Sequence, residues 1–465
     1  MYAKTFVSLL LAGCIVSAQD AREILKQSLN TLGDVKTIQY TGSGATFTVG
    51  QNVNPATPWP RVEVKSFTQS YDYEKGASQT DGVGPQGPTP SQFLSGDRAW
   101  GRVGTNVNPA APNVVALRQL QLLMTPHGFL KAALASNATA KGGKAGAQKV
   151  TLVSFMQGKQ RVTGTISGDH LVQRVESQLD NPVLGDMPVE TDFSDYRDFS
   201  GVKFPARLIQ KQGGFPAFDL TVTDLKANVP LDLAVPDTVR DAVPPAVKVA
   251  SEKLGEGVWY LTGGSHHSVL VEFRDHVAVI EAPLTEARSE AVIAEVKGLV
   301  PGKPIRYLIS THHHFDHSGG LRAYMAEGST IVTHQSNKAF YERVAKFPHT
   351  LNPDRLSRQR RNAKILAVGA RHVLTDGSQS MEIHHIQGNP HNDGILMVYL
   401  PKDKLLVEVD VYTPLAPNAT PPATPNPNTV NLYENIERLK LDVEPIAPLH
   451  GRLVTLADLR KAIGK

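Results

Sequence analysis

The chain has almost no cysteine: Cys14 is the single one among 465 residues. One thiol cannot form an intramolecular pair, so a disulfide framework is excluded. Cys14 lies in an apolar run at the N-terminus, which leaves no thiolate for a metal ion in the rest of the chain. Any metal site must therefore be built from histidine and carboxylate side chains.

The chain also lacks a strong excess of charge. Its formal net charge is +4, which is small for 465 residues, and no cluster of lysine and arginine is interleaved with aromatic side chains. Nucleic-acid-binding proteins usually show such a basic patch. We therefore expect a small-molecule substrate and no nucleic acid. The hydrophobic fraction of 41% is sufficient for two cores, and the length has room for two domains.

Long apolar runs are missing beyond the N-terminus. Residues 1–18 have the organisation of a secretory signal: Met1–Lys4 is basic, Thr5–Gly13 is apolar, and Val16–Ala18 is a small-residue cleavage site. The apolar run is too short to span a bilayer stably. We therefore expect a periplasmic or secreted protein with a bacterial export signal.

The N-terminal signal allows two forms of the mature protein. Leu11–Cys14 resembles a bacterial lipobox, in which the cysteine is lipidated and attaches the protein to a membrane. Cleavage after Ala18 instead leaves a soluble exported protein. The short apolar run and the good Val-Ser-Ala site slightly favour the soluble form.

Residues 311–317 read Thr-His-His-His-Phe-Asp-His, which places four histidines and one aspartate within six positions. Neutral imidazole nitrogen and carboxylate oxygen are the usual ligands of zinc and its neighbours. The preceding apolar run 305–310 predicts a buried strand, and 321–326 predicts a helix. The histidines therefore lie where a core strand turns into a helix, a place where ligands gather in α/β folds.

The spacing His-x-His-x-Asp-His resembles the signature of the metallo-β-lactamase fold superfamily. That family's other pieces follow in order: a histidine three residues before a glycine, a strand ending in aspartate, and a late strand ending in histidine. The candidate ligands are His312, His314, Asp316, His317, His391, Asp410 and His450. The resemblance covers about residues 250–465 and implies an αββα sandwich.

The resemblance also implies a role for each ligand. One metal ion is implied on His312, His314 and His391, and a second on Asp316, His317 and His450, with Asp410 bridging the two. A bridging carboxylate keeps two dications about 3.5–4 Å apart. The implied cofactor is two Zn²⁺ ions, with iron as the alternative, sharing a water whose pKa falls towards ~7. The implied reaction is hydrolysis, in which Asp316 also has a catalytic duty, orienting the nucleophile.

Two positions depart from the family pattern. Strand 277–281 ends in Glu281, where the family commonly has an aspartate that orients a ligand. The segment around His391 reads Pro-His-Asn-Asp-Gly and not the commoner Gly-His-Thr-x-Gly. With histidine and aspartate alone as ligands, the resemblance is to glyoxalase II, lactonases and related hydrolases, and not to β-lactamases that use a thiolate.

Other histidines have less certain assignments by pattern. His313 lies between two ligands and should point the opposite way, as a structural residue. His266 and His267 lie in a turn between the expected strands 258–262 and 269–273. In the superfamily this hairpin often borders the active site, so contact with substrate and an ordinary turn both stay open. His334, His384 and His385 are left outside the site.

Residues 20–245 predict a different, mostly antiparallel β domain. An amphipathic helix at 21–29 and a helical stretch at 116–135 accompany segments with alternating apolar residues. The strand-like segments are 38–47, 61–71, 98–103, 148–155, 161–167, 171–179, 189–199, 203–211 and 217–226. The pattern suggests a curved sheet or half-barrel and loosely resembles bacterial periplasmic lipoprotein-carrier domains. A structural or docking role and lipid or partner binding both stay open.

Taken together, the sequence predicts an α+β protein with a signal peptide (1–18), a β-rich domain (20–245) and a hydrolase domain (250–465). Ester, thioester, lactone and β-lactam-type bonds all suit the chemistry. Two alternatives remain: an iron-containing redox enzyme of the same fold, and an envelope lipid- or partner-binding protein with a vestigial metal site. Residues 414–427 contain many prolines, so nothing regular is expected there, and they form either a rim over the substrate or a surface excursion.

Overall fold

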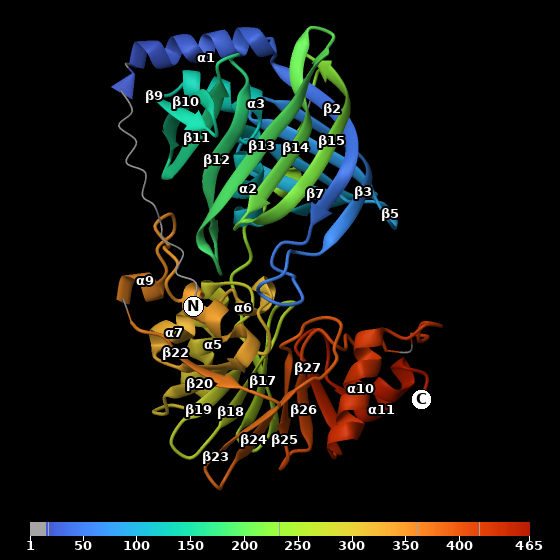
Figure 1. Cartoon of the computed structure of the whole chain (residues 1–465). Helices are drawn as coiled ribbons and strands as arrows, with labels where there is room; N and C mark the ends of the chain where they lie inside the picture. The colour runs from blue at the N-terminus through green and yellow to red at the C-terminus, as the bar shows by residue number, and fades with distance from the viewer. Residues whose placement is uncertain (1–14, 17, 232, 360, 418) are drawn as a thin grey trace. The chain divides into compact units, whose positions relative to one another are not determined.

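The computed structural model describes residues 15–16, 18–231, 233–359, 361–417 and 419–465 (Figure 1). Most of the predicted signal sequence, including Cys14, lies outside the described residues. The described chain forms two compact units. The first contains residues up to Phe47, Arg61–Leu179 and Met187–Pro244, and the second contains Thr48–Pro60, Asp180–Asp186 and Pro245–Lys465.

The first unit is built on one large sheet with antiparallel neighbours, as the sequence predicts. Its strand order is β1-β9-β10-β11-β12-β13-β14-β15-β2-β3-β4-β6-β7-β8, with β5 beside β4. The strands are β1 (Ile15–Val16), β2 (Thr37–Phe47), β3 (Arg61–Asp72), β4 (Ala77–Gly84), β5 (Gly87–Pro88), β6 (Ser91–Ser95), β7 (Arg98–Val103), β8 (Asn106–Pro109), β9 (Thr139–Ala145), β10 (Gln148–Gln157), β11 (Gln160–Ser167), β12 (Val172–Asn181), β13 (Gly185–Phe199), β14 (Val202–Gln212) and β15 (Phe215–Ala227).

The sheet of the first unit curves around α2 (Pro112–Leu123) and α3 (Pro126–Leu134), and α1 (Ala18–Leu32) lies across one end of it (Figure 1). The unit also contains the short helix α4 (Asp237–Arg240). Alternate residues of β14, such as Phe204 and Leu208, are buried, as expected for a strand with one face on a core. Phe129 of α3 is fully buried against Gly164 of β11, where a β-carbon would lie only 2.2 Å from its ring.

The prediction of one helix at 116–135 is wrong, because the structure has two helices there, α2 and α3. α2 ends at Leu123, and Thr125 caps α3 by accepting a hydrogen bond from the N–H of Gly128 at 3.1 Å. Pro126 follows at the first helical position, where its missing N–H costs nothing. The Thr-Pro pair therefore ends one helix and starts another.

The second unit contains two sheets. The first has the order β16-β17-β18-β19-β20-β21-β22 and the second β23-β24-β25-β26-β27-β28. Their strands are β16 (Ala250–Gly255), β17 (Val258–Thr262), β18 (Ser268–Glu272), β19 (Val277–Ile280), β20 (Ile305–Ile309), β21 (Thr330–His334), β22 (Lys364–Val368), β23 (Arg371–Thr375), β24 (Ser380–His385), β25 (Leu396–Leu400), β26 (Leu405–Glu408), β27 (Pro445–Pro448) and β28 (Val454–Thr455). β19 to β22 run parallel, and so do β26 and β27.

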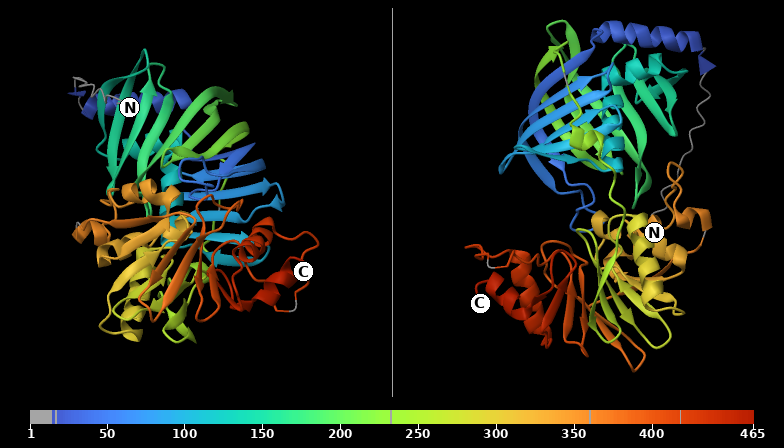
Figure 2. Two further views of the ribbon diagram at one scale, coloured as in Figure 1. Left: turned by 60° about the horizontal axis from the view of Figure 1, so that its bottom comes forward. Right: turned by 180° about the vertical axis from the view of Figure 1, so that it is seen from behind.

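Helices cover the outer faces of both sheets, which gives four layers in the order α, β, β, α (Figures 1 and 2). The helices are α5 (Glu286–Leu299), α6 (Phe315–Ser318), α7 (Leu321–Glu327), α8 (Lys338–Val344), α9 (Arg355–Gln359), α10 (Pro427–Leu439) and α11 (Leu456–Ala462), with a 3₁₀ turn at Gln335–Asn337. One core lies between the sheets, and a second lies under α5, α7 and α8. The predicted α+β class and sandwich are confirmed.

The described helices include none that is both long and apolar enough to cross a membrane. In the proline-rich run 414–427, the described residues 414–417 and 419–426 form no helix or strand, and α10 begins at Pro427. Asn426 caps that helix by accepting a hydrogen bond from the N–H of Asn428 at 2.9 Å.

Candidate metal centre

The histidine-rich segment lies at the carboxyl end of β20, as its sequence predicts. β20 ends at Ile309, and α6 begins at Phe315, so the intervening residues leave a buried parallel strand. The hydroxyl of Tyr341 donates to the carbonyl of His312 at 2.8 Å, and that of Ser318 donates to the carbonyl of His314 at 2.9 Å. These bonds fix the backbone from which the imidazoles project.

A first group of possible metal ligands contains His312, His314, His391 and Asp410, whose ligand atoms all lie within 4.8 Å of one another. Asp410 Oδ2 lies 3.2 Å from His312 Nε2 and 3.1 Å from His391 Nε2. His314 Nε2 donates to the carbonyl of Asn52 at 3.0 Å, which leaves Nδ1 as the atom that faces the group. These are the residues that the sequence assigned to the first ion, together with the bridging aspartate.

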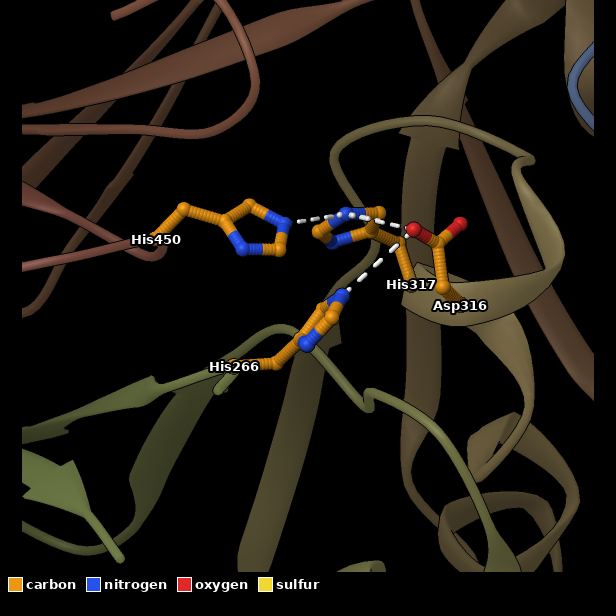
Figure 3. A group of neighbouring side chains, drawn as sticks. All are labelled: His266, Asp316, His317 and His450. Carbon is orange, nitrogen blue, oxygen red and sulfur yellow. Dashed lines mark hydrogen bonds and ion pairs between the residues drawn. The ribbon is translucent and has the colours of Figure 1, made fainter. Parts of the chain in front are cut away.

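A second group contains His266, Asp316, His317 and His450 (Figure 3). His450 Nε2 lies 3.0 Å from His317 Nε2, and Asp316 Oδ2 lies 3.7 Å from His317 Nε2. Three of the four residues are those predicted for the second ion. The fourth, His266, comes from the turn between β17 and β18.

Asp410 contacts both groups. Its Oδ1 lies 2.8 Å from His450 Nε2, and its Oδ2 lies 3.1 Å from His317 Nε2 and close to two histidines of the first group. A bridging carboxylate needs this position, with one side chain shared by two sets of ligands. Asp410 also has a φ of +62°, in the left-handed region that is uncommon for non-glycine residues.

The residues present fit a pair of divalent metal ions. His312 Nε2 and His314 Nδ1 are buried and make no hydrogen bond within the described part of the chain. The facing nitrogens of His317 and His450 can share a hydrogen bond only if one of them holds a proton, whereas both can direct lone pairs at one ion. Imidazole and carboxylate are also the donors that zinc and iron accept.

The electrostatics of the centre favour a neutral imidazole at His314, a protonated one at His317 and an ionised carboxylate at Asp410. Burial, with help from neighbouring histidines, lowers the pKa of His314 to about 4, which keeps it in its ligand form. Burial also disfavours a charge on His317, but Asp410 and Glu281 outweigh that effect and raise the pKa of His317 to about 10. Burial raises the pKa of Asp410, but His317 and the other histidines lower it far below its usual range. The site therefore attracts positive charge.

Glu281, where the family commonly has aspartate, lies behind the ligands. It is fully buried with a φ of +75°, and its Oε2 lies 3.5 Å from His317 Nδ1 and accepts the hydroxyl of Thr311. The longer side chain therefore still reaches a ligand. A carboxylate behind the far nitrogen of a histidine fixes the ring and makes it a stronger ligand.

The sequence reading missed the segment Thr48–Pro60, which clusters with the second unit although it lies between β2 and β3 in the chain. Gln51 Nε2 donates to Asp316 Oδ1 at 2.7 Å. Asn52 accepts from His314 through its carbonyl and from His313 Nε2 through Oδ1, both at 3.0 Å. The sequence of this segment signals a loop, but nothing in it indicates contact with residues some 260 positions away.

The histidines left outside the ligand groups have other partners. His313 donates from Nε2 to Asn52 and accepts at Nδ1 from Asn392 Nδ2 at 3.1 Å, so it points away from the ligands. His267 packs edge-on against Tyr260 with ring centroids 5.0 Å apart. His334 stacks on His385 with centroids 4.2 Å apart.

Comparisons with known proteins agree with the geometry. A sequence profile described as the metallo-beta-lactamase superfamily matches residues 261–432. Residues 261–432, within the second unit, are therefore similar to the metallo-beta-lactamase superfamily. The matched segment contains six of the seven predicted ligands, and His450 follows the segment in the chain. A search of curated proteins gave no match.

Solved structures that match part of this chain include two metallo-beta-lactamases and one oxidoreductase. The Pontibacter korlensis metallo-beta-lactamase is 16% identical, covering 47% of this chain and 98% of its own, with a TM-score of 0.36. FIM-1 from Pseudomonas aeruginosa, in its mono-zinc form, is 18% identical over 48% of this chain and 96% of its own, with a TM-score of 0.36. The rubredoxin oxygen:oxidoreductase of Desulfovibrio gigas is 15% identical, covering 46% of this chain and 61% of its own, with a TM-score of 0.36.

Proposed function

We propose that this chain is an exported hydrolase that uses two zinc ions to cleave an ester, thioester, lactone or β-lactam-type bond. The observation that carries the proposal is Asp410, whose two oxygens contact both groups of candidate ligands. His312, His314 and His391 would hold one ion, and Asp316, His317 and His450 the other. Bound as a pair, such ions would lower the pKa of a shared water towards ~7 and stabilise negative charge in the transition state.

The protein's own residues keep the centre closed on one side and open on the other. The side chain of His312 is fully buried, whereas 35% of Asp316 and 21% of both His391 and His450 are exposed. Substrate and water therefore approach over Asp316, His391 and His450. Buried histidines exclude water from the opposite side, which strengthens every electrostatic interaction within the site.

Asp316 is placed to orient a reacting water. Gln51 holds its Oδ1 at 2.7 Å and directs Oδ2 towards His317. An ionised Oδ2 can accept a hydrogen bond from a neighbouring water and so turn a lone pair of that water towards the substrate. Burial raises the pKa of Asp316, but His266, His317 and Gln51 lower it well below its usual range, so the carboxylate stays ionised.

The proposal is tested by the hydrolysis of a panel of ester, thioester, lactone and β-lactam substrates by the metal-loaded full chain. Turnover that a chelator abolishes and zinc restores would support it. Bound iron without zinc, with oxidation or reduction in place of hydrolysis, would replace it by the redox alternative. No turnover of any bond class, with no retained metal, would contradict it.

A binding role for the first unit is a second proposal. It has a cavity of about 430 Å³ between α2, α3 and neighbouring strands, lined in part by Leu120, Leu123 and Ala132. This volume is within the range of small-molecule sites. Ala132→Trp places a large ring in the cavity. Lipid that co-purifies with the wild-type chain and is lost from this variant would support the proposal. Equal lipid in both proteins would contradict it.

Export and membrane attachment are also proposals. They are tested by the mass and N-terminal sequence of the protein recovered from the envelope of an expressing bacterium. A mature N-terminus at Gln19 supports a soluble form, and an acylated Cys14 supports a lipoprotein. A full-length chain retained in the cytoplasm would contradict export.

A further inference from the structure

His266 belongs to the second ligand group, although the metallo-beta-lactamase resemblance assigns it no metal. It lies in the turn between β17 and β18, and only 12% of its side chain is exposed. Its ring points at Asp316, His317 and His450, which approach from other elements (Figure 3). Its Nε2 lies 3.4 Å from Asp316 Oδ2.

We propose that His266 Nε2 is a further ligand of the second metal ion, beside Asp316, His317 and His450. The inference deepens the proposed function and rests on its second ion. By the family pattern, the second ion has Asp316, His317, His450 and the shared Asp410 as its ligands. His266 would add one neutral nitrogen ligand to this set.

The separations within the group match a single coordination sphere. Zinc lies about 2.0–2.1 Å from imidazole nitrogen, so neighbouring ligands of a four- or five-coordinate ion lie about 2.9–3.6 Å apart. The structure has 3.4 Å from His266 to Asp316, 3.7 Å from Asp316 to His317 and 3.0 Å from His317 to His450, each between the facing ligand atoms. One ion can therefore contact all four residues with only small shifts.

The ring of His266 is oriented by its other nitrogen. Nδ1 lies 2.8 Å from Ser265 Oγ. A proton on Nδ1 donated to that hydroxyl leaves the lone pair of Nε2 directed at the group. Metal-binding histidines usually have such a partner, which fixes the tautomer and the ring plane. Asp316 is oriented in the same way, because Gln51 binds Oδ1 and leaves Oδ2 towards His266.

The backbone of the turn is also fixed beside a ligand. The N–H of His267 donates to the carbonyl of Leu449 at 2.9 Å, next to His450. The two neighbouring histidines then diverge: His267 packs against Tyr260, and the ring of His266 lies edge-on to that of His450, with centroids 3.9 Å apart. The turn therefore places His267 in the core and His266 beside the candidate metal ligands.

The test measures metal affinity in the full chain, so it does not depend on a known substrate. Metal-free wild type, His266→Ala, His266→Gln and His372→Ala are titrated with Zn²⁺ against a chromophoric chelator and with Co²⁺ by visible absorption. His372 on β23 is the matched control, because it belongs to none of the candidate ligand groups. Free imidazole is then added to the cobalt-loaded His266→Ala protein.

We expect wild type and His372→Ala to bind two ions alike. In His266→Ala the first ion should be retained, and the second should bind at least tenfold more weakly, since even partners behind a ligand contribute 10–100-fold to affinity. The cobalt spectrum should change and free imidazole should restore it, which a purely structural residue would not show. If His266→Ala does not fold, His266→Gln gives the same comparison.

Two results would overturn the inference, and they are distinguishable. If the His266 variants bind both ions with wild-type affinity and an unchanged cobalt spectrum, His266 is no ligand, while the dinuclear hydrolase stands. If wild type itself binds fewer than two ions, the proposed function fails together with the inference.

Discussion

Asn52 links the segment Thr48–Pro60 to the histidines of the metal centre. Its replacement by alanine should therefore lower both the stability of the second unit and its affinity for metal. The side chain is 3% exposed. Its Nδ2 donates to the carbonyls of Asn54 at 2.8 Å and Thr57 at 2.9 Å, and its Oδ1 accepts from His313 at 3.0 Å. Alanine removes all three hydrogen bonds and leaves buried groups without partners.

The expected cost follows from these bonds. Each contributes about 0.5–1.5 kcal/mol net, so Asn52→Ala should lower the free energy of unfolding of the second unit by about 2–4 kcal/mol. The backbone carbonyl of Asn52 that orients His314 stays in the chain but loses its anchor. Affinity for the first metal ion should therefore fall about tenfold, as for other partners behind a ligand.

The assay is chemical unfolding of the metal-free chain, followed by zinc titration. Because the chain has two units, each transition is fitted separately. Asn54→Ala is the control in the same segment, since its Nδ2 bonds Asp393 Oδ2 at an exposed position and should contribute less than about 1 kcal/mol. An Asn52→Ala protein within about 0.5 kcal/mol of wild type, with unchanged zinc affinity, would refute the reasoning.

Four other substitutions test the metal centre, the core of the first unit and one buried ion pair. Asp410→Ala and His312→Ala should each abolish hydrolysis while the protein still folds, and unchanged turnover in either would contradict the proposed mechanism. Gly164→Ala should destabilise the first unit by about 1–3 kcal/mol in thermal unfolding, because its β-carbon meets the ring of Phe129 at 2.2 Å; an unchanged transition would mean that the core adjusts freely. Burial alone raises the pKa of Asp354, but Arg322 and the N–H of Ser357 lower that pKa to about 2. The ion pair with Arg322 should therefore add about 2 kcal/mol to the free energy of unfolding above pH ~4. This contribution should be lost as the pH falls towards ~2. Asp354→Asn should flatten that part of the stability-against-pH curve, and an identical slope in the variant would contradict the assignment.

Much of the second unit could be predicted because its signals are local. Apolar runs such as Ile305–Ile309 predict buried strands, and the order of His312, Asp410 and His450 along the chain is specific to one fold. The departure at Glu281 could be noticed from the sequence, but only the structure shows that the side chain still reaches His317.

The rest depends on contacts between distant parts of the chain. Gln51 and Asn52 are ordinary loop residues by sequence, and their contacts with the histidines appear only when the chain folds. Strands such as β4 and β9 were missed because their sequences are rich in polar residues and glycine, and they are held by backbone pairing with β3 and β10. For His266 the sequence leaves substrate contact and an ordinary turn both open, because the direction of its ring depends on the hydrogen bonds of the folded turn.

The most direct test of the central claim is elemental analysis of the mature protein purified without chelator, with Asp410→Ala beside it. The account predicts close to two zinc ions per chain in wild type and a clear loss of metal in the variant, because Asp410 contacts both ligand groups. No retained metal in wild type, or equal metal in the two proteins, would contradict it.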